Sequence, residues 1–351
     1  MSAGEVVLRA TGLRKEFTRG GFLAGERSVL RAVDEVSLEL RAGQTLGLVG
    51  ESGSGKSTLG KLLLRLEEPT SGSIEFAGQD VTHADRRAMR RLRTKLRMVF
   101  QDPYSSLNPR MTIGDIVAEP LRIHRVHKGA ELDRHVSELF DRCGLSPDWR
   151  TRYPHELSGG QRQRVGIARA LSLSPDVLIA DEPVSALDVS VQASILNLLV
   201  DLQREMGFAC LFISHDLGVV EYVSDQTAVM YLGQIVERSS TFELFVQPRH
   251  PYTQSLLSAT LPLADEDVEV QRIVLHGDLP NPVSPPPGCR FHTRCPIAAD
   301  VCSVETPALV PRGGDDHPVA CHFVAEDGRP PYVPATPLGH GDDGAGADAQ
   351  A

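Results

Sequence analysis

The sequence predicts an α/β fold followed by a small, cysteine-rich C-terminal domain, and three observations lead to this prediction. Apolar, strand-like runs alternate with helical segments over residues 5–240, as in a sheet that is covered by helices on both faces. A glycine-rich turn at 50–57 lies directly between one such run and a helix. After residue 240 the composition changes to proline-rich chain with four cysteines between 289 and 321.

Length and charge exclude several classes of protein. The 351 residues can form one large domain or two ordinary ones, and 41% of them are hydrophobic. The net charge of −10 argues against bulk binding to nucleic acid. A basic run at 86–97 is more typical of a solvated helix face than of an RNA-binding patch. The longest apolar runs are too short to cross a bilayer, and the N-terminus lacks a signal region, so we expect no export.

The first third of the chain is expected to be mainly strands. Period-two alternation over 5–50, with a tight turn at "AGQ", indicates short strands that end at the glycine-rich turn. The segment "SGSIEFAGQDV" (71–81) indicates a hairpin, and the basic run that follows it indicates a helix. The segment "LRMVFQDP" (96–103) indicates a buried strand that ends at Pro103.

The middle of the chain combines a helical part with further strands. Residues 112–150 have a helical pattern and no obvious strand, which predicts a helical subdomain over about 104–170. The segments "PDVLIADEP" (175–183) and "ACLFISHD" (209–216) indicate two buried strands with a helix between them. The strand-like "GQIVERSS" (233–240) closes this part of the chain.

We therefore divide the chain into three parts. Residues 1–240 form the α/β domain, and 241–335 form a C-terminal extension that carries the cysteine cluster. Residues 336–351, which end in "GHGDDGAGADAQA", are small, acidic and predicted to be disordered.

The glycine-rich turn "GESGSGKST" has the composition of a phosphate-binding loop. Backbone N–H groups can surround an anion only where side chains do not obstruct them, and the following helix adds its N-terminal partial charge. In this scheme Lys56 reaches the β- and γ-phosphates, and the Ser57 hydroxyl binds Mg²⁺. The loop consists of Gly50, Glu51, Ser52, Gly53, Ser54, Gly55, Lys56, Ser57 and Thr58. The sequence predicts that it binds a nucleoside triphosphate.

Two carboxylates follow the apolar strand "VLIADE" (177–182). In enzymes with a phosphate-binding loop, the strand-end aspartate helps to hold Mg²⁺, which assigns this role to Asp181. Glu182 comes next, where it can accept a proton from water that attacks the γ-phosphate. An apolar strand ending in "DE" is weak evidence alone, but it is strong evidence together with the loop at 50–57.

A second anion-binding stretch, "LSGGQ" (157–161), offers a hydroxyl, two glycines and a helix N-terminus. Its residues Ser158, Gly159, Gly160 and Gln161 form the signature motif of a known family. The sequence resembles the nucleotide-binding subunit of an ATP-binding cassette (ABC) transporter. The resemblance implies the P-loop ABC-type fold with a mixed sheet, with ATP and Mg²⁺ as ligands. It also implies that the signature of one subunit covers ATP held by the partner's loop, so that a monomer is nearly inactive.

The resemblance assigns four further residues. Gln101 in "VFQDP" matches the Q-loop glutamine, which senses Mg²⁺ and the membrane subunit. Asp188 in "SALD" matches the D-loop at the subunit contact, and His215 in "ISHD" matches the switch histidine at the γ-phosphate. Phe17 is the aromatic residue assigned to stack on adenine. All motifs are present in order over residues 5–240.

Other segments indicate the branch of the family. The segments "FQDPYSSLNPRMTIGDIVAEPL" (100–121) and "RHPYTQSLLSATLP" (249–262) resemble importers of dipeptides and oligopeptides. The extension at 286–323 is similar to the C-terminal extension of those ATPases, and "PYSSLNPR" favours the second of their two paired ATPase subunits. The same branch includes nickel and other small-solute importers.

The spacing of Cys289, Cys295, Cys302 and Cys321 offers four thiolates for Zn²⁺ or an iron–sulfur cluster. It matches neither the ferredoxin patterns nor a paired zinc motif, so unmetallated thiols also remain possible. The resemblance favours a [4Fe–4S] cluster, since members of this branch can hold one at the matching cysteines.

We therefore expect an ATP-hydrolysing motor subunit of a di- or oligopeptide importer, peripheral on the cytoplasmic face of the membrane. The resemblance implies an identical or paralogous ATPase partner, two integral membrane permease subunits and an extracytoplasmic solute-binding protein. It implies no nucleic acid. The alternatives are the same motor for nickel or another small solute, and a soluble ABC ATPase of translation or DNA repair. A P-loop kinase or GTPase is disfavoured because neither needs "LSGGQ".

Overall fold

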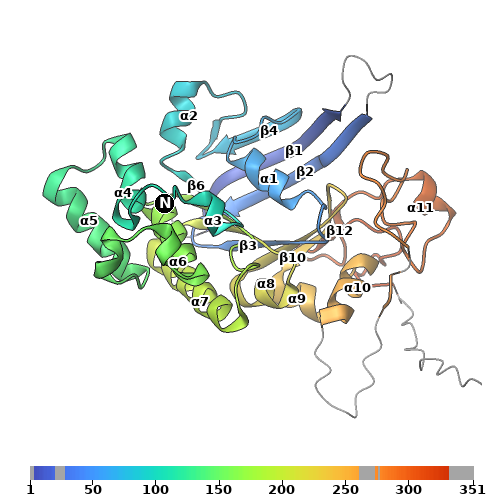
Figure 1. Cartoon of the computed structure of the whole chain (residues 1–351). Helices are drawn as coiled ribbons and strands as arrows, with labels where there is room; N and C mark the ends of the chain where they lie inside the picture. The colour runs from blue at the N-terminus through green and yellow to red at the C-terminus, as the bar shows by residue number, and fades with distance from the viewer. Residues whose placement is uncertain (1–3, 20–27, 261–272, 276, 332–351) are drawn as a thin grey trace, which may run out of the picture.

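The computed structural model describes residues 4–19, 28–260, 273–275 and 277–331. Within these residues the strands form two sheets (Figure 1). The smaller sheet has the order β2-β1-β4-β5, and all its neighbouring strands are antiparallel. The larger has the order β11-β12-β10-β9-β3-β8-β7-β6, with parallel pairing from β9 to β6 and antiparallel pairing beyond β9. The sheet is therefore mixed, as expected.

The smaller sheet is made of β1 (Val6–Arg19), β2 (Ser28–Arg41), β4 (Ser71–Phe76) and β5 (Gln79–Asp80). The hairpin predicted at 71–81 is confirmed as β4 and β5. The first two strands are long rather than short, at 14 residues each. Their pairing shifts register at several bulges, for example between Ala10 and Leu13. Because a bulge interrupts period-two alternation, the pattern in the sequence looks like several shorter strands.

The larger sheet has a parallel centre whose strands end at one edge. Its strands are β3 (Thr45–Val49), β6 (Leu96–Val99), β7 (Val177–Asp181), β8 (Ala209–Ile213), β9 (Gln226–Tyr231), β10 (Gln234–Ser240), β11 (Val310–Pro311) and β12 (Pro318–Val319). The strands β3, β7 and β8 are buried at every residue, which explains their continuous apolar sequences. In such sheets ligands bind beyond the carboxyl ends of the strands.

Helix α1 (Lys56–Leu63) lies between the two sheets (Figure 1). Its Leu59, Leu62 and Leu63 are fully buried in a core shared with both sheets. The helix therefore has a fixed position, and the loop that precedes it is attached to the centre of the core.

The other face of the larger sheet is covered by helices (Figure 1). These are α6 (Gly159–Leu171), α7 (Val189–Met206) and α8 (Leu217–Val223). A helical part containing α3 (Pro103–Ser106), α4 (Ile113–His124), α5 (Gly129–Arg142) and two 3-10 helices, Pro147–Thr151 and Pro154–Glu156, packs on α6. These helices occupy the stretch in which the sequence has a helical pattern and no obvious strand. The basic run was expected to be one helix, but α2 spans only Arg86–Leu92. A turn at 93–95 ends α2, and the last residues of the run enter β6.

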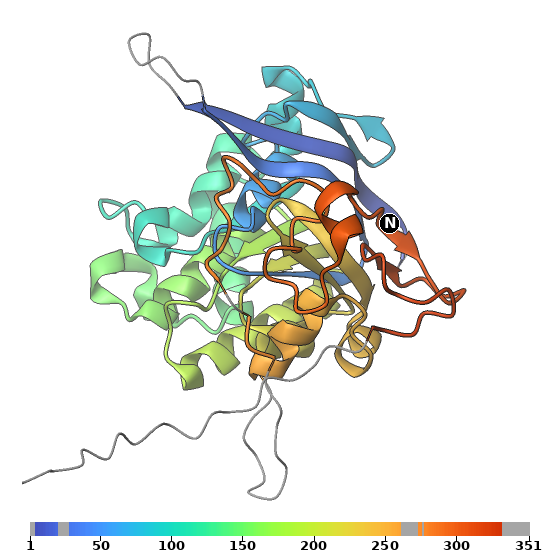
Figure 2. The same ribbon diagram turned by 90° about the vertical axis from the view of Figure 1, so that its right-hand side faces the viewer.

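The C-terminal segment packs along the sheet edge, as Figure 2 shows. It contains α9 (Thr241–Val246), α10 (Pro251–Thr260) and α11 (Asp300–Val304), and its β12 pairs with β10 through Val319 and Glu237. Glu237 is fully buried and accepts hydrogen bonds from the backbone N–H groups of Arg249 and His250, at 2.6 and 3.0 Å. His317 Nε2 lies 2.7 Å from the same carboxylate. The segment therefore completes the edge of the sheet.

Candidate functional site

The glycine-rich loop between β3 and α1 requires glycine at two positions, one near each of its ends. Gly50 and Gly55 have φ values of 153° and 104°. A Cβ atom at Gly50 would lie 2.1 Å from the backbone oxygen of Met230, and one at Gly55 would lie 2.1 Å from that of Ala32. Any side chain would collide with backbone at both positions, so the loop packs directly on β9 and β2.

Lys56 is buried at the centre of this loop. Its Nζ donates to the backbone oxygens of Gly50 at 2.7 Å and Glu51 at 2.9 Å. Burial lowers the pKa of Lys56, while the charges of Glu182, Asp181 and Glu51 act in the opposite direction. An ammonium group held here among backbone dipoles is suited to bind phosphate oxygens.

Ser57 and Asp181 are 124 positions apart in the sequence but meet at the strand ends, where Ser57 Oγ donates to Asp181 Oδ1 at 2.8 Å. Burial raises the pKa of Asp181, and the nearby charge of Glu182 raises it further. A hydroxyl and a carboxylate are oxygen ligands of the kind that Mg²⁺ binds. The two oxygens could hold such an ion, whose charge would favour the ionised carboxylate.

Glu182 lies beside Asp181, and polar side chains approach it from two other strand ends. Gln101 Nε2 donates to Glu182 Oε2 at 2.8 Å, and His215 Nδ1 lies 3.3 Å from Glu182 Oε1. The backbone of Glu182 has a φ of 45°, a left-handed conformation that is costly for a residue with a side chain. The fold therefore places this carboxylate next to an amide, an imidazole and the loop.

These groups line one cleft of about 620 Å³. The sequence-predicted residues in its wall are Phe17, Ser52, Gly53, Gly55, Lys56, Ser57, Thr58, Gln101, Glu182 and His215. Sequence reasoning missed six residues that line the same cleft: Leu30, Arg31, Ala32, Leu232, Gly233 and Pro282. No local motif marks these six residues, and only the packing of distant segments brings them to the loop.

Other predicted residues do not line this cleft. Gly50, Glu51 and Ser54 of the loop are not among the lining residues, and neither is Asp181; Ser54 and Asp181 are buried. Ser158 begins α6 with a capping box, in which the N–H of Gln161 donates to Ser158 Oγ at 3.3 Å. A Cβ atom at Gly159 would lie 3.2 Å from the Leu187 side chain, next to Asp188. Because Ser158 and Asp188 are exposed, the signature faces outward from its own chain.

The four late cysteines line a different and much smaller pocket, together with Phe291, His292 and His322. Burial raises the pKa of Cys295 to about 12 and of Cys321 to about 11. All six cysteines are free thiols. Cys143 and Cys210 are buried elsewhere in the main core. In the described part of the chain, no three or more His, Cys, Asp or Glu side chains are arranged as a metal site.

Across the described ranges, no helix combines the length and the apolar character that a membrane span requires.

Two family models match the chain. The ABC transporter model matches residues 33–185, and the model of the oligopeptide/dipeptide transporter C-terminal region matches residues 236–302. The second match covers three of the four late cysteines and ends at Cys302.

Curated relatives match over most of the chain. An oligopeptide transport ATP-binding protein of Bacillus subtilis, AppF, is 49% identical over 92% of this chain and 98% of its own length. A putative peptide import ATP-binding protein of Brucella ovis is 52% identical over 80% of this chain and 89% of its own length. Among solved structures, a dimeric ATP-binding cassette bound to ADP and Pi is 28% identical with a TM-score of 0.59. The match covers 67% of this chain and 98% of the chain in the solved structure.

Proposed function

The chain belongs to the ABC transporter family, in its oligopeptide and dipeptide transporter branch, and from this we propose how its residues act. It is the ATP-binding subunit of a peptide importer and hydrolyses ATP for transport. The observation that carries this function is the cleft in which Lys56, Ser57 and Glu182 converge from the loop, the helix and a strand end.

The loop and the strand ends bind the nucleotide in this proposal. Lys56 and the loop N–H groups contact the phosphates of ATP, and Ser57, Asp181 and Gln101 hold Mg²⁺, which neutralises phosphate charge when bound. The 2.8 Å contact between Ser57 and Asp181 supports this assignment. Phe17, which is 36% exposed at the wall of the cleft, stacks on adenine.

Glu182 acts as the general base. Its carboxylate accepts the proton of the water that attacks the γ-phosphate, and Gln101 and His215 position it through the contacts at 2.8 and 3.3 Å. His215 also contacts the γ-phosphate. Most of the catalytic effect then comes from charges that are already in place around the transferred group.

A second ATPase subunit, identical or paralogous, completes the site. The exposed Ser158 and Asp188 support this proposal because they lie outside the cleft of their own chain and can face the partner's loop. The solved relative with ADP and Pi is itself a dimer. ATP closes the two subunits, and hydrolysis reopens them.

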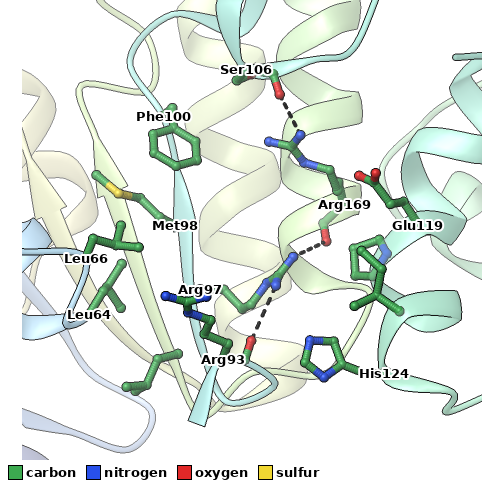
Figure 3. Close-up of a pocket in the computed structure, with 13 residues that line it drawn as sticks. Leu64, Leu66, Arg93, Arg97, Met98, Phe100, Ser106, Glu119, His124 and Arg169 are labelled. Carbon is green, nitrogen blue, oxygen red and sulfur yellow. Dashed lines mark hydrogen bonds between the residues drawn. The ribbon is translucent and has the colours of Figure 1, made fainter. Parts of the chain in front are cut away.

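A groove at the edge of the sheet supports contact with permease subunits (Figure 3). This permease groove has a volume of about 620 Å³, and Leu66, Phe100 and Ile123 expose apolar surface in it. Three arginines, Arg93, Arg97 and Arg169, also line the groove, and Glu119 and His124 lie across from them. Burial and the charge of Arg169 lower the pKa of Arg97 to about 10. We propose that each permease subunit has a short cytoplasmic helix with apolar and acidic residues, and that one such helix occupies this groove.

The groove gives a test of the proposed role. We propose that the chain lies peripherally on the cytoplasmic face, and co-expression with the permease subunits is expected to bring it into the membrane fraction. Ile123→Asp should remove it from that fraction because it buries a charge in the apolar part of the groove. Phe242→Asp, at a residue of α9 that is 73% exposed, is the matched control. Cross-linking that finds only ribosomal or DNA contacts would contradict the transport role and favour a soluble ABC ATPase.

The transported solute is a dipeptide or oligopeptide, delivered by an extracytoplasmic binding protein. The relatives named for peptide transport support this more strongly than the alternative solutes, nickel or another small solute. To separate these solutes, the uptake of labelled peptides should be compared with the uptake of nickel in cells that carry the complete transporter.

We propose the domain bounds predicted from the sequence: an ATPase domain at 1–240 with a helical subdomain at about 104–170, and an extension at 241–335. The change of architecture after β10 supports the first boundary. The tail predicted at 336–351 lies outside the described residues.

The late cysteines are the metal site of this proposal. Cys289, Cys295, Cys302 and Cys321 share one pocket, which supports a [4Fe–4S] cluster, with Zn²⁺ as the alternative. Their high pKa values arise from burial, with a contribution from one another's charges, and a bound cation would stabilise the thiolates instead. The thiols would have to rotate toward one another, since they do not form a ligand set as placed. The role is structural because ATP hydrolysis needs no electron transfer.

A [4Fe–4S] cluster would give the purified protein a visible colour. Anaerobic purification should give brown protein that absorbs near ~400 nm with about four irons per chain. Replacing any one of the four cysteines with serine should abolish the colour, whereas Cys143→Ala should keep it. Stoichiometric zinc without iron would reject the cluster but keep the four-thiolate site, and absence of both metals would reject the site.

A further inference from the structure

Glu51, the second residue of the phosphate loop, is attached to the C-terminal segment. Arg294 Nη1 donates to both oxygens of the Glu51 carboxylate at 3.0 Å. The backbone N–H of Glu51 donates to Tyr252 Oη at 2.9 Å. Tyr252 and Arg294 follow Glu51 by 201 and 243 positions in the sequence. Neither Tyr252 nor Arg294 is part of the loop motif, so the motif alone does not predict these two contacts.

The two contacts are held in a buried environment. The Arg294 side chain is only 10% exposed, and Tyr252 is fully buried. The Tyr252 ring packs against Tyr231 and Phe291, with ring centres 4.7 and 5.4 Å apart. Rings packed in this way have little freedom to turn, so the Tyr252 hydroxyl has a fixed position.

Tyr252 acts on the peptide group that holds the loop lysine. The peptide between Gly50 and Glu51 presents its carbonyl oxygen to Lys56 Nζ at 2.7 Å and its N–H to Tyr252 Oη at 2.9 Å. Gly50 has a φ of 153°, and glycine lets this peptide turn with little steric cost. Because Tyr252 binds one side of the peptide, it fixes the side that faces the lysine.

We propose that Tyr252 and Arg294 are positioning residues for ATP binding, through which the C-terminal segment holds the phosphate loop in its binding conformation. Tyr252 orients the Gly50–Glu51 peptide, and Arg294 fixes the Glu51 side chain outside the cleft. Neither residue lines the cleft, so neither contacts the nucleotide. This inference rests on the proposed function, since it assumes that the loop binds ATP.

A purely structural role is the competing explanation, because other residues already attach the segment to the body of the protein. Arg290 pairs with Asp34 of β2, and the backbone N–H groups of Arg249 and His250 donate to Glu237 of β10. A further ion pair, Arg249 with Asp315 at 2.5 Å, lies within the segment itself. If Tyr252 and Arg294 only add to this attachment, their loss should lower thermal stability without a specific effect on nucleotide affinity.

The test measures the Kd for Mg-ATP and the melting temperature of the nucleotide-free protein. Tyr252→Phe removes only a hydroxyl and leaves the Glu51 N–H without its partner, and we expect affinity to fall about 5- to 30-fold. Tyr222→Phe is the matched control, because its hydroxyl bonds Asn197 away from the loop. Asp315→Asn is the control for a broken ion pair in the same segment. Both controls should leave the Kd unchanged.

Arg294 gives a second, independent readout. Arg294→Ala is expected to raise the KM for ATP by a similar factor while kcat at saturating ATP is retained. Arg294→Lys should recover part of the affinity, since one nitrogen makes both contacts in the native protein. The double variant Arg294→Ala/Glu51→Ala should bind ATP no more weakly than the single variants do, because the two residues act as a pair.

The possible outcomes separate the two levels of the argument. Wild-type protein that fails to bind Mg-ATP would reject the proposed function itself. Wild-type protein that binds, with Tyr252→Phe and Arg294→Ala variants of unchanged Kd, would reject the positioning role alone. A melting temperature that falls equally in these variants and in Asp315→Asn, without a selective change in Kd, would likewise assign them to structure only.

Discussion

Glu182→Gln protein is expected to bind ATP with nearly unchanged affinity and to hydrolyse it ~10²–10⁴-fold more slowly. The loss corresponds to roughly 3–5 kcal/mol of transition-state stabilisation, at about 1.36 kcal/mol per factor of ten. The physical reason is that an amide cannot accept the proton of the attacking water. Gln101 and His215 lie 2.8 and 3.3 Å from this carboxylate, and the cleft around them is otherwise unchanged by the substitution.

Steady-state phosphate release and equilibrium ATP binding should be measured on the same purified protein. Glu205→Gln is the matched control, since Glu205 lies in α7 and makes only a surface pair with Arg142 at 3.4 Å. Hydrolysis by the Glu182→Gln protein at the native rate would remove Glu182 from the role of general base. Trapping of ATP-bound dimers by this variant would support the closed state that we propose.

Lys56→Ala is expected to weaken nucleotide binding itself by about 10- to 100-fold, because hydrogen bonds to a charged group contribute ~1.5–3 kcal/mol. Lys56 is buried, and its Nζ is fixed by two loop oxygens at 2.7 and 2.9 Å, so the ammonium is positioned before ATP arrives. Removing it also takes away a positive charge that acts on Asp181 and Glu182.

Titration with a fluorescent ATP analogue measures this loss. Lys95→Ala is the control: Lys95 precedes β6 at the opposite end of the parallel strands, where it pairs with Asp176 at 3.1 Å. An unchanged Kd in the Lys56→Ala protein would show that the phosphates bind elsewhere. An equal loss in both variants would indicate a general loss of folding instead.

The sequence predicts the centre of the molecule well because the relevant constraints are local. Gly50 and Gly55 are dictated by contacts of one residue with adjacent backbone, and their spacing is visible in a stretch of nine residues. The meeting of Ser57 with Asp181 follows from a general property of parallel strands, whose carboxyl ends lie at one edge. Local motifs and strand order together were sufficient for these residues.

The same reasoning fails where the structure depends on contacts between distant segments. The two residues of β12 carry no alternating pattern, so their pairing with β10 could not be predicted. Arg31 and Pro282 reach the cleft only through the packing of other segments. Tyr252 and Arg294 meet Glu51 across more than half of the chain, and no pattern in the extension indicates a contact with the loop.

The closing of the sheet edge by β12 has a consequence for the order in which the protein is made. The ribosome completes β10 well before His317, which follows Glu237 by 80 positions. At about 5–20 residues per second, that interval lasts roughly 4–16 s. During it, the nascent chain has an open strand edge and a carboxylate that lacks its imidazole partner. A message truncated in this interval would therefore yield a product that is prone to aggregate, although every residue of the ATP cleft except Pro282 precedes the end of β10.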